Sequence, residues 1–131
     1  MTFAYTKESS KSPEQARAAL EAALGQARFS VLWHLDMSAT LEGKGFAGHG
    51  ETHIFEVCNA SRADAALRMA PEIAYFLPCK MLVRQAGAGS EIGLLLPSAL
   101  IGLTGGATEE LTTFAAEVEG DLRAVVDEAA R

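Results

Sequence analysis

Hydrophobic and polar residues alternate along several stretches of the chain, which is the pattern of β-strands that bury one face. The clearest stretch spans residues 29–37, and others span 2–6, 52–58, 79–85 and 91–96. In residues 29–37 the alternation predicts one face made of Phe29, Val31, Trp33, Leu35 and Met37. The opposite face of that strand then holds Ser30, Leu32, His34 and Asp36.

Hydrophobic residues three and four positions apart predict helices between these strands. The first helix begins at Pro13, because Ser12 and Gln15 have the spacing of a capping box. Its stripe consists of Ala16, Ala19, Leu20, Ala23, Leu24 and Ala27. A second helix runs over residues 60–70 with Asn59 or Ser61 as its N-cap, and Pro71 prevents its continuation.

Two further helices are predicted in the last third of the chain. Residues 97–103 favour a short apolar helix, and residues 109–129 hold a helical period over five turns. Thr108 is the expected N-cap of this last helix. Its wide apolar stripe suits packing on the sheet, and it suits a dimer interface equally well.

The order of these elements predicts an α+β fold. The glycine-rich residues 42–51 are interpreted as a mobile loop, and residues 86–89 as the turn of a hairpin between 79–85 and 91–96. Such links favour a mostly antiparallel sheet with helices packed on one face. At 131 residues, the chain is expected to form a single domain, 1–131.

Composition narrows the classes of partner. The 11 Lys and Arg residues against 17 Asp and Glu residues give a net charge of −6, which disfavours nucleic acid and anionic membrane surfaces. The longest apolar run, 92–103, is shorter than the roughly twenty residues that cross a bilayer. The N-terminal residues lack the pattern of a secretory signal, so we expect a cytoplasmic protein.

The two cysteines are the strongest candidates for chemistry. Cys58 closes one predicted strand and Cys79 opens another, so both are expected near one edge of the sheet. Their spacing matches no zinc motif, and a helix starting after Asn59 would lower the pKa of the Cys58 thiol. This pattern predicts a two-thiol site for a soft metal or a sulfur species, with His34 or His53 as a third ligand.

A ligand pocket is the related interpretation. Trp33, Phe55 and Phe76 are candidates to line a small apolar pocket with the two thiols at its rim, and Pro78 fixes the backbone before the second thiol. The alternative is that these aromatic residues and both cysteines are simply core, because free cysteine is among the most buried residue types.

Catalysis finds less support in the sequence. His34 and Asp36 share one strand face and suggest an acid/base pair, but a half-exposed polar face explains the same pattern. No nucleophile completes a triad, and neither of the glycine-rich segments 43–45 and 102–106 has the spacing of a phosphate-binding loop. The sequence does not identify a cofactor, and we favour a protein without catalytic activity.

Several short motifs, taken together, resemble the domain of unknown function family 302. That family reads roughly CNP, then a helix with small residues, P-x-I-G and LPC. The matching segments here are 57–60, 63–67, 70–73 and 76–79, with further likeness at Asp36, Leu41 and Lys44. The sequence departs from the family pattern at Glu56, Ala60 and Ala74.

The resemblance implies a fold like that of the TATA-box-binding protein, β-α-β(4)-α with additions, and a homodimer. It implies no DNA binding, since shared folds do not transfer function. Two functions remain open. The first is a small ligand-binding or soft-metal and sulfur-handling module based on Cys58, Asn59, Pro78, Cys79 and Trp33. The second is a non-catalytic homodimeric interaction domain with both cysteines buried.

Overall fold

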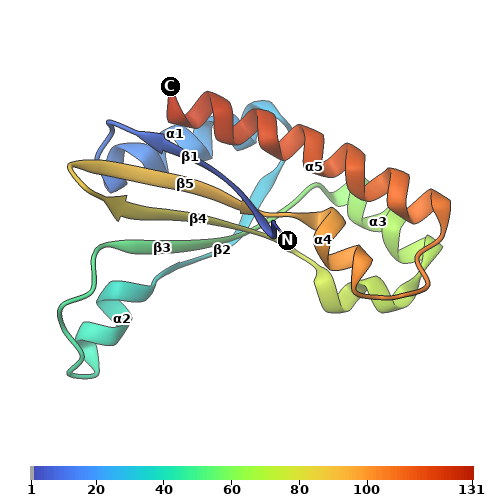
Figure 1. Ribbon diagram of the computed structural model, residues 1–131, viewed down its shortest axis with the longest axis horizontal. Coiled ribbons are helices and arrows are strands. Elements are labelled where there is room, and N and C mark those ends of the chain that lie inside the picture. The colour runs from blue at the N-terminus through green and yellow to red at the C-terminus, as the bar shows by residue number, and fades with distance from the viewer. Residues whose placement is uncertain (1) are drawn as a thin grey trace.

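The computed structural model describes residues 2–131 as a five-stranded antiparallel sheet with helices (Figure 1). The strands lie in the order β1-β5-β4-β3-β2. This confirms the predicted α+β class with a mostly antiparallel sheet. Along the chain the elements are β1 (Ala4–Ser9), α1 (Pro13–Gln26), β2 (Ser30–Asp36), α2 (Met37–Gly43), β3 (Thr52–Cys58), α3 (Ala60–Met69), the 3₁₀ helix η1 (Pro71–Phe76), β4 (Cys79–Ala86), β5 (Gly89–Leu95), α4 (Pro97–Gly102) and α5 (Glu109–Ala130).

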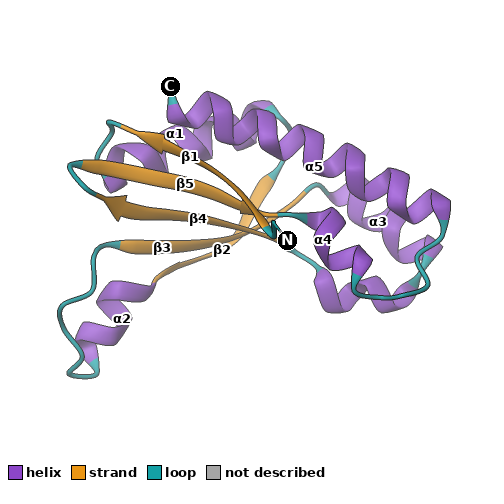
Figure 2. Ribbon diagram, in the orientation of Figure 1, coloured by secondary structure: helices purple, strands orange, loops and turns teal. Residues whose placement is uncertain are grey.

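Helices α1 and α5 cover one face of the sheet, and the main core lies between these two layers (Figure 2). The strands contribute every second residue to this core, as a pleated strand with one buried face requires. The buried side chains from the strands are Phe55, Val57, Met81, Val83, Ile92 and Leu94. Those from the helices include Leu20, Leu24, Leu122 and Val126.

The predicted helix starts are confirmed by their caps. Ser12 accepts a hydrogen bond from the Gln15 amide while the Gln15 side chain accepts one from the Ser12 amide, which completes the capping box of α1. Asn59 caps α3, and Thr108 caps α5. The turn between β4 and β5 also lies where it was predicted, with Gly87 at φ +56°.

Strand β2 corrects the predicted orientation of Trp33. The pairing with β3 shifts register between Val31 and Trp33, so the extra residue of a β-bulge reverses the alternation after that point. Trp33 is therefore 48% exposed instead of packing in the core with Phe29. His34 now pairs with Phe55 and shares its face of the sheet.

Helix α2 was not predicted: its first residue, Met37, was assigned to the strand and its last two, Glu42 and Gly43, to the glycine-rich loop. Asp36 accepts a hydrogen bond from the Ala39 amide at 2.9 Å, which caps α2 and ends β2 one residue earlier. The loop predicted over 42–51 is therefore wrong at 42–43, which are helical, and agrees with the structure at 46–51, which have no regular structure.

The element order β1-α1-β2-β3-β4-β5-α5 is compatible with the arrangement that the resemblance implies, with α2, α3, η1 and α4 as insertions. Within residues 2–131, every helix is too short or too polar to span a bilayer.

Candidate functional site

The two cysteines lie at neighbouring strand ends. Cys58 is the last residue of β3 and Cys79 the first of β4, and Cys79 pairs directly with Val57 in the ladder between these strands. Both are free thiols. The structure therefore brings together the two residues on which the predicted site depends.

The local sequence fixes both strand ends. Asn59 follows Cys58 and caps α3 by accepting a hydrogen bond from the Arg62 amide at 3.1 Å, so the chain turns directly from strand to helix. On the other side, a cis peptide bond joins Leu77 to Pro78 immediately before Cys79. Asn59 and Pro78 are thus the direct chain neighbours of Cys58 and Cys79.

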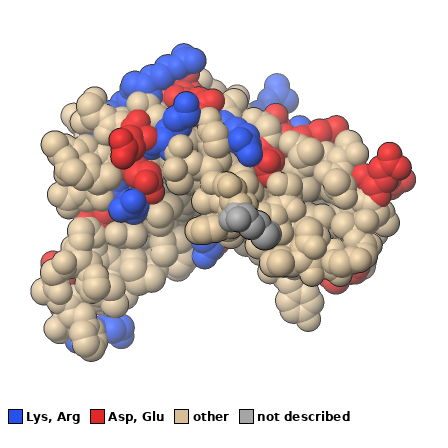
Figure 3. All heavy atoms as spheres, in the orientation of Figure 1, with Lys and Arg blue, Asp and Glu red and all other residues tan. Residues whose placement is uncertain are grey.

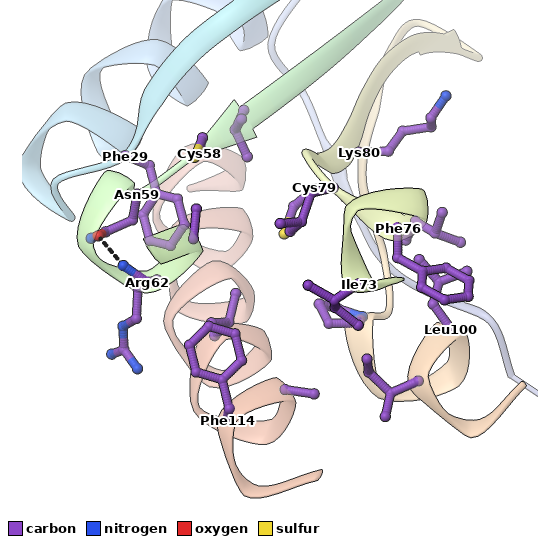
Figure 4. A pocket seen from close by; sticks show the side chains of 18 residues that line it. Phe29, Cys58, Asn59, Arg62, Ile73, Phe76, Cys79, Lys80, Leu100 and Phe114 are labelled. Atoms are coloured by element: carbon purple, nitrogen blue, oxygen red, sulfur yellow. Dashed lines mark hydrogen bonds between the residues drawn. The ribbon is translucent and has the colours of Figure 1, made fainter. Parts of the chain in front are cut away.

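An apolar cavity of about 50 Å³ opens beside the cysteines. Figure 4 shows Phe29, Cys58 and Phe114 on one side of it, and Cys79 and Leu100 on the other. The surrounding elements are α3 and α5 on the first side and η1 and α4 on the second. A cavity of this size has room for a small apolar group, since a single water needs only about 10–15 Å³ measured in this way.

A second, minor core lies next to the cavity. It is separate from the main core between the sheet and the helices α1 and α5, and it consists of Ala66, Ile73, Ile101, Leu111 and Ala115. These residues come from α3, η1, α4 and α5, so the insertions after β3 and β5 build a minor hydrophobic cluster next to the strand ends.

Burial keeps both thiols protonated. Burial, followed by the nearby Cys58 and Glu56, raises the pKa of Cys79 to about 11. Burial also raises the pKa of Cys58, so the lowering expected from the start of α3 does not prevail. Neutral thiols are weak nucleophiles and weak metal ligands, because the thiolate is the reactive form.

Other predicted site residues lie away from the cysteines. His34 stacks on Phe55, with ring centroids 4.8 Å apart, and it contacts His53 instead of a thiol. Trp33 does not line the cavity. Among residues 2–131, no group of three His, Cys, Asp or Glu side chains is arranged to hold a metal ion.

Charged side chains at the rim of the cavity are already paired. Arg62 donates to Glu117 at 3.0 Å and to Asp121 at 2.8 Å, which ties α3 to α5. Lys80 lies 3.3 Å from Glu56. The rim therefore offers little uncompensated charge to an ionic ligand.

Sequence reasoning missed several residues of this site. Phe114 and Leu100 line the cavity, but their spacing is that of ordinary helix core. Arg62 follows the predicted N-cap by three residues, and nothing local shows that its partners lie more than 50 residues away on α5.

Comparison with known proteins identifies the family. The family model described as domain of unknown function DUF302 matches residues 5–129. The chain belongs to the DUF302 family. A solved structure, described as an uncharacterized conserved DUF302 protein from Bacillus stearothermophilus, is 33% identical with a TM-score of 0.93, and the match covers 100% of both chains. No curated protein matches the chain.

The segments on which the resemblance to DUF302 rests converge in space. Residues 57–60, 70–73 and 76–79 are separated along the chain, yet each contributes side chains to the cavity wall. In this DUF302 protein, the family-like motifs and the cavity thus coincide.

Proposed function

We propose that this DUF302 protein binds a small apolar ligand in the cavity beside Cys58 and Cys79. The observation that supports this most directly is the cavity itself, which is lined by apolar side chains from the insertions α3, η1 and α4, from α5 and from the ends of β3, β4 and β5. Ligand sites are typically concave and mostly apolar, with few polar groups.

The chemistry of the thiols favours an apolar ligand over a soft metal. The raised pKa values keep both sulfur atoms neutral near pH 7, and a neutral thiol behaves as a polarizable hydrophobic group. In this proposal Cys79 forms part of the cavity wall and Cys58 part of its rim. Asn59 and Pro78 hold the strand ends in place.

Xenon is a suitable probe, because it is small and binds apolar cavities that stay dry. We expect chemical-shift changes in Ile73, Leu100 and Phe114 when the protein is titrated with xenon. Leu100→Phe should fill the cavity and abolish these changes. Leu67→Phe is the matched control, since Leu67 is 39% exposed on α3 and does not line the cavity. If the wild-type protein shows no saturable change, the proposed ligand site is wrong.

A second candidate is a homodimeric interaction domain, and the uncovered face of the sheet favours it. Leu35, Ile54 and Leu82 form a row across β2, β3 and β4 on the face opposite the core, and Trp33 on this face is 48% exposed. Figure 3 shows that charged side chains gather on the upper part of the molecule, while the hollow underside has few. Apolar surfaces of this kind mark interfaces.

Sedimentation measurements test this second candidate. Trp33→Glu should shift a dimer toward monomer, and Tyr75→Glu is the control because Tyr75 is 90% exposed on η1. A monomeric wild-type protein at high concentration would contradict the homodimer.

Either function fits a cytoplasmic location, where free thiols persist. The net charge of −6 disfavours a nucleic-acid partner.

A further inference from the structure

Helix α4 forms part of the wall of the cavity beside the cysteines. Pro97, Leu100 and Ile101 of this helix line the cavity, and Figure 4 shows Leu100 on the same side as Cys79. Ile101 is buried and belongs to the minor core, whereas Leu100 is half-buried. A movement of α4 away from α5 would therefore open the cavity, together with the Cys79 thiol in its wall.

The start of α4 is bound by a side chain from another helix. The N-cap position of α4 holds Leu96, whose apolar side chain cannot accept a hydrogen bond. Instead, Oε1 of Glu119 on α5 accepts hydrogen bonds from the Ser98 amide at 3.1 Å and from the Ser98 hydroxyl at 2.5 Å. One carboxylate, 21 residues further along the chain, thus satisfies two donors in the first turn of α4.

The surroundings of Glu119 hold its carboxylate ready for this contact. Its side chain is only 13% exposed, and its Oε2 accepts a hydrogen bond from Arg123 at 3.3 Å. The guanidinium of Arg123 lies over the ring of Tyr5, 4.6 Å from its centroid. Burial acts to raise the pKa of Glu119, but the hydrogen bonds from Ser98 and the charge of Arg123 outweigh it and lower that pKa. The carboxylate is therefore ionised near pH 7, and its hydrogen bonds to Ser98 are charge-assisted.

The other helices in the cavity wall are attached differently. Helix α3 is joined to α5 by the two ion pairs of Arg62. Helix η1 is connected to β4 by only two residues, Leu77 and Pro78. Helix α4, in contrast, is followed by the exposed residues 103–108, which have no regular structure. The length of this connection leaves α4 room to move relative to α5.

We propose that α4 is the gate through which a small apolar ligand enters the cavity, and that the contact between Ser98 and Glu119 holds this gate closed; the gate rests on the ligand site proposed above. A ligand reaches a closed site only when part of the wall opens transiently. Opening replaces the two hydrogen bonds to Glu119 by hydrogen bonds to water, so its cost is moderate. Glu119 is thus a positioning residue that acts on the cavity through Ser98.

The Cys79 thiol reports opening of the gate without any ligand. A thiol in the closed wall is alkylated only from the open state, so its rate with iodoacetamide follows the population of that state. We expect Ser98→Ala and Glu119→Gln each to accelerate labelling of Cys79 by about tenfold, because each weakens charge-assisted hydrogen bonds. Labelling of Cys58 in the same sample should hardly change, since Cys58 lies at the rim and its thiol is already accessible.

Further variants separate gating from a general loss of stability. Glu128→Gln removes an equal charge from α5 at a residue that pairs with Arg131 away from the cavity, and it should leave Cys79 labelling unchanged. Ser98→Thr keeps the hydroxyl and should label like the wild-type protein. Combining Ser98→Ala with Glu119→Gln should accelerate labelling by clearly less than the product of the single effects, because both break the same contact. Acceleration that only follows a loss of global stability in urea overturns the gate.

Xenon exchange connects the gate to the ligand site. Line broadening of the Ile73 and Leu100 signals under xenon gives the rate of entry, which should rise by about tenfold in Glu119→Gln. The affinity should change little, because the closed form still predominates. If xenon binds but neither the entry rate nor Cys79 labelling responds to Glu119→Gln, the gate is wrong and the ligand site stands. If xenon does not bind to the wild-type protein, the ligand site is wrong, and the gate is overturned with it.

Discussion

Cys79 lies directly opposite Val57 in the β3–β4 ladder, so its thiol shares the buried side of the sheet with the Val57 side chain. Cys58 is one residue further along β3 and is not part of either buried cluster. Two cysteines that are neighbours in the fold thus lie in different environments, and their reactivity should differ accordingly.

Thiol labelling measures this difference. Burial raises the pKa of Cys79 to about 11, so only about one thiol in a thousand is ionised at pH 8. We expect Cys79 to react with iodoacetamide more slowly than Cys58, and its rate to rise about tenfold per pH unit up to its pKa. Mass spectrometry of the Cys58→Ser and Cys79→Ser variants assigns each rate. Equal rates at the two thiols would contradict the buried position of Cys79.

The raised pKa of Cys79 also predicts that the free energy of unfolding decreases at alkaline pH. Its pKa is raised in the folded state, from 9.0 to about 11, so the folded protein favours the neutral thiol more than the unfolded chain does. Stability is therefore complete below the unfolded pKa and is lost as the pH rises through the window from 9.0 to about 11.

Urea unfolding at about pH 8 and about pH 10.5 should show this loss as about 2 kcal/mol beyond that of the Cys79→Val variant. The comparison with Cys79→Val removes contributions from lysine and tyrosine residues, which titrate alike in both proteins. If the two proteins lose the same stability between these pH values, the thiol is not held in its neutral form by burial.

Much of the fold could be predicted from the sequence because its elements have strong local determinants. Helix α1 begins with a capping box at Ser12, and α5 has both an N-cap at Thr108 and a long apolar stripe. In both helices the local sequence agrees with the position of the helix in the fold. The bulge after Val31 could not be predicted, since an extra residue in a strand changes pairing with β3 without leaving a pattern of its own.

The candidate site was predictable only in part. The positions of Cys58 and Cys79 at strand ends follow from local patterns. The resemblance to DUF302 indicated in addition that both cysteines belong to family motifs. Their burial depends on α4 and α5, which pack there from far along the chain. The contact between His53 and Glu51 is local in sequence, since the two residues are only two positions apart. The contact between His34 and His53 depends on how β2 pairs with β3, which the sequence does not show.

The minor core gives a further prediction about stability. Ile73 is 4% exposed in that cluster, whereas Leu77, which follows it at the end of η1, is only half-buried. We expect Ile73→Ala to lower the free energy of unfolding by about 2–4 kcal/mol and Leu77→Ala by about 1–2 kcal/mol, since the cost grows with the cavity created. Denaturant titration distinguishes them, and the reverse order would show that the cluster is centred elsewhere.

Two glycines should respond to alanine substitution in opposite directions. Gly89 begins β5 where β1 passes closely, and a Cβ atom there would overlap the backbone carbonyl of Ser9. Gly25 lies in α1, and a Cβ atom there would meet no atom within 4 Å.

Gly89→Ala should therefore destabilise the protein by about 1–3 kcal/mol, because backbone atoms of β1 must move. Gly25→Ala should stabilise it by about 0.5–1 kcal/mol, because alanine loses less conformational freedom in a helix. Thermal and urea unfolding of the two variants beside the wild-type protein checks both signs. A neutral Gly89→Ala variant would mean that β1 is not held against the start of β5 in solution.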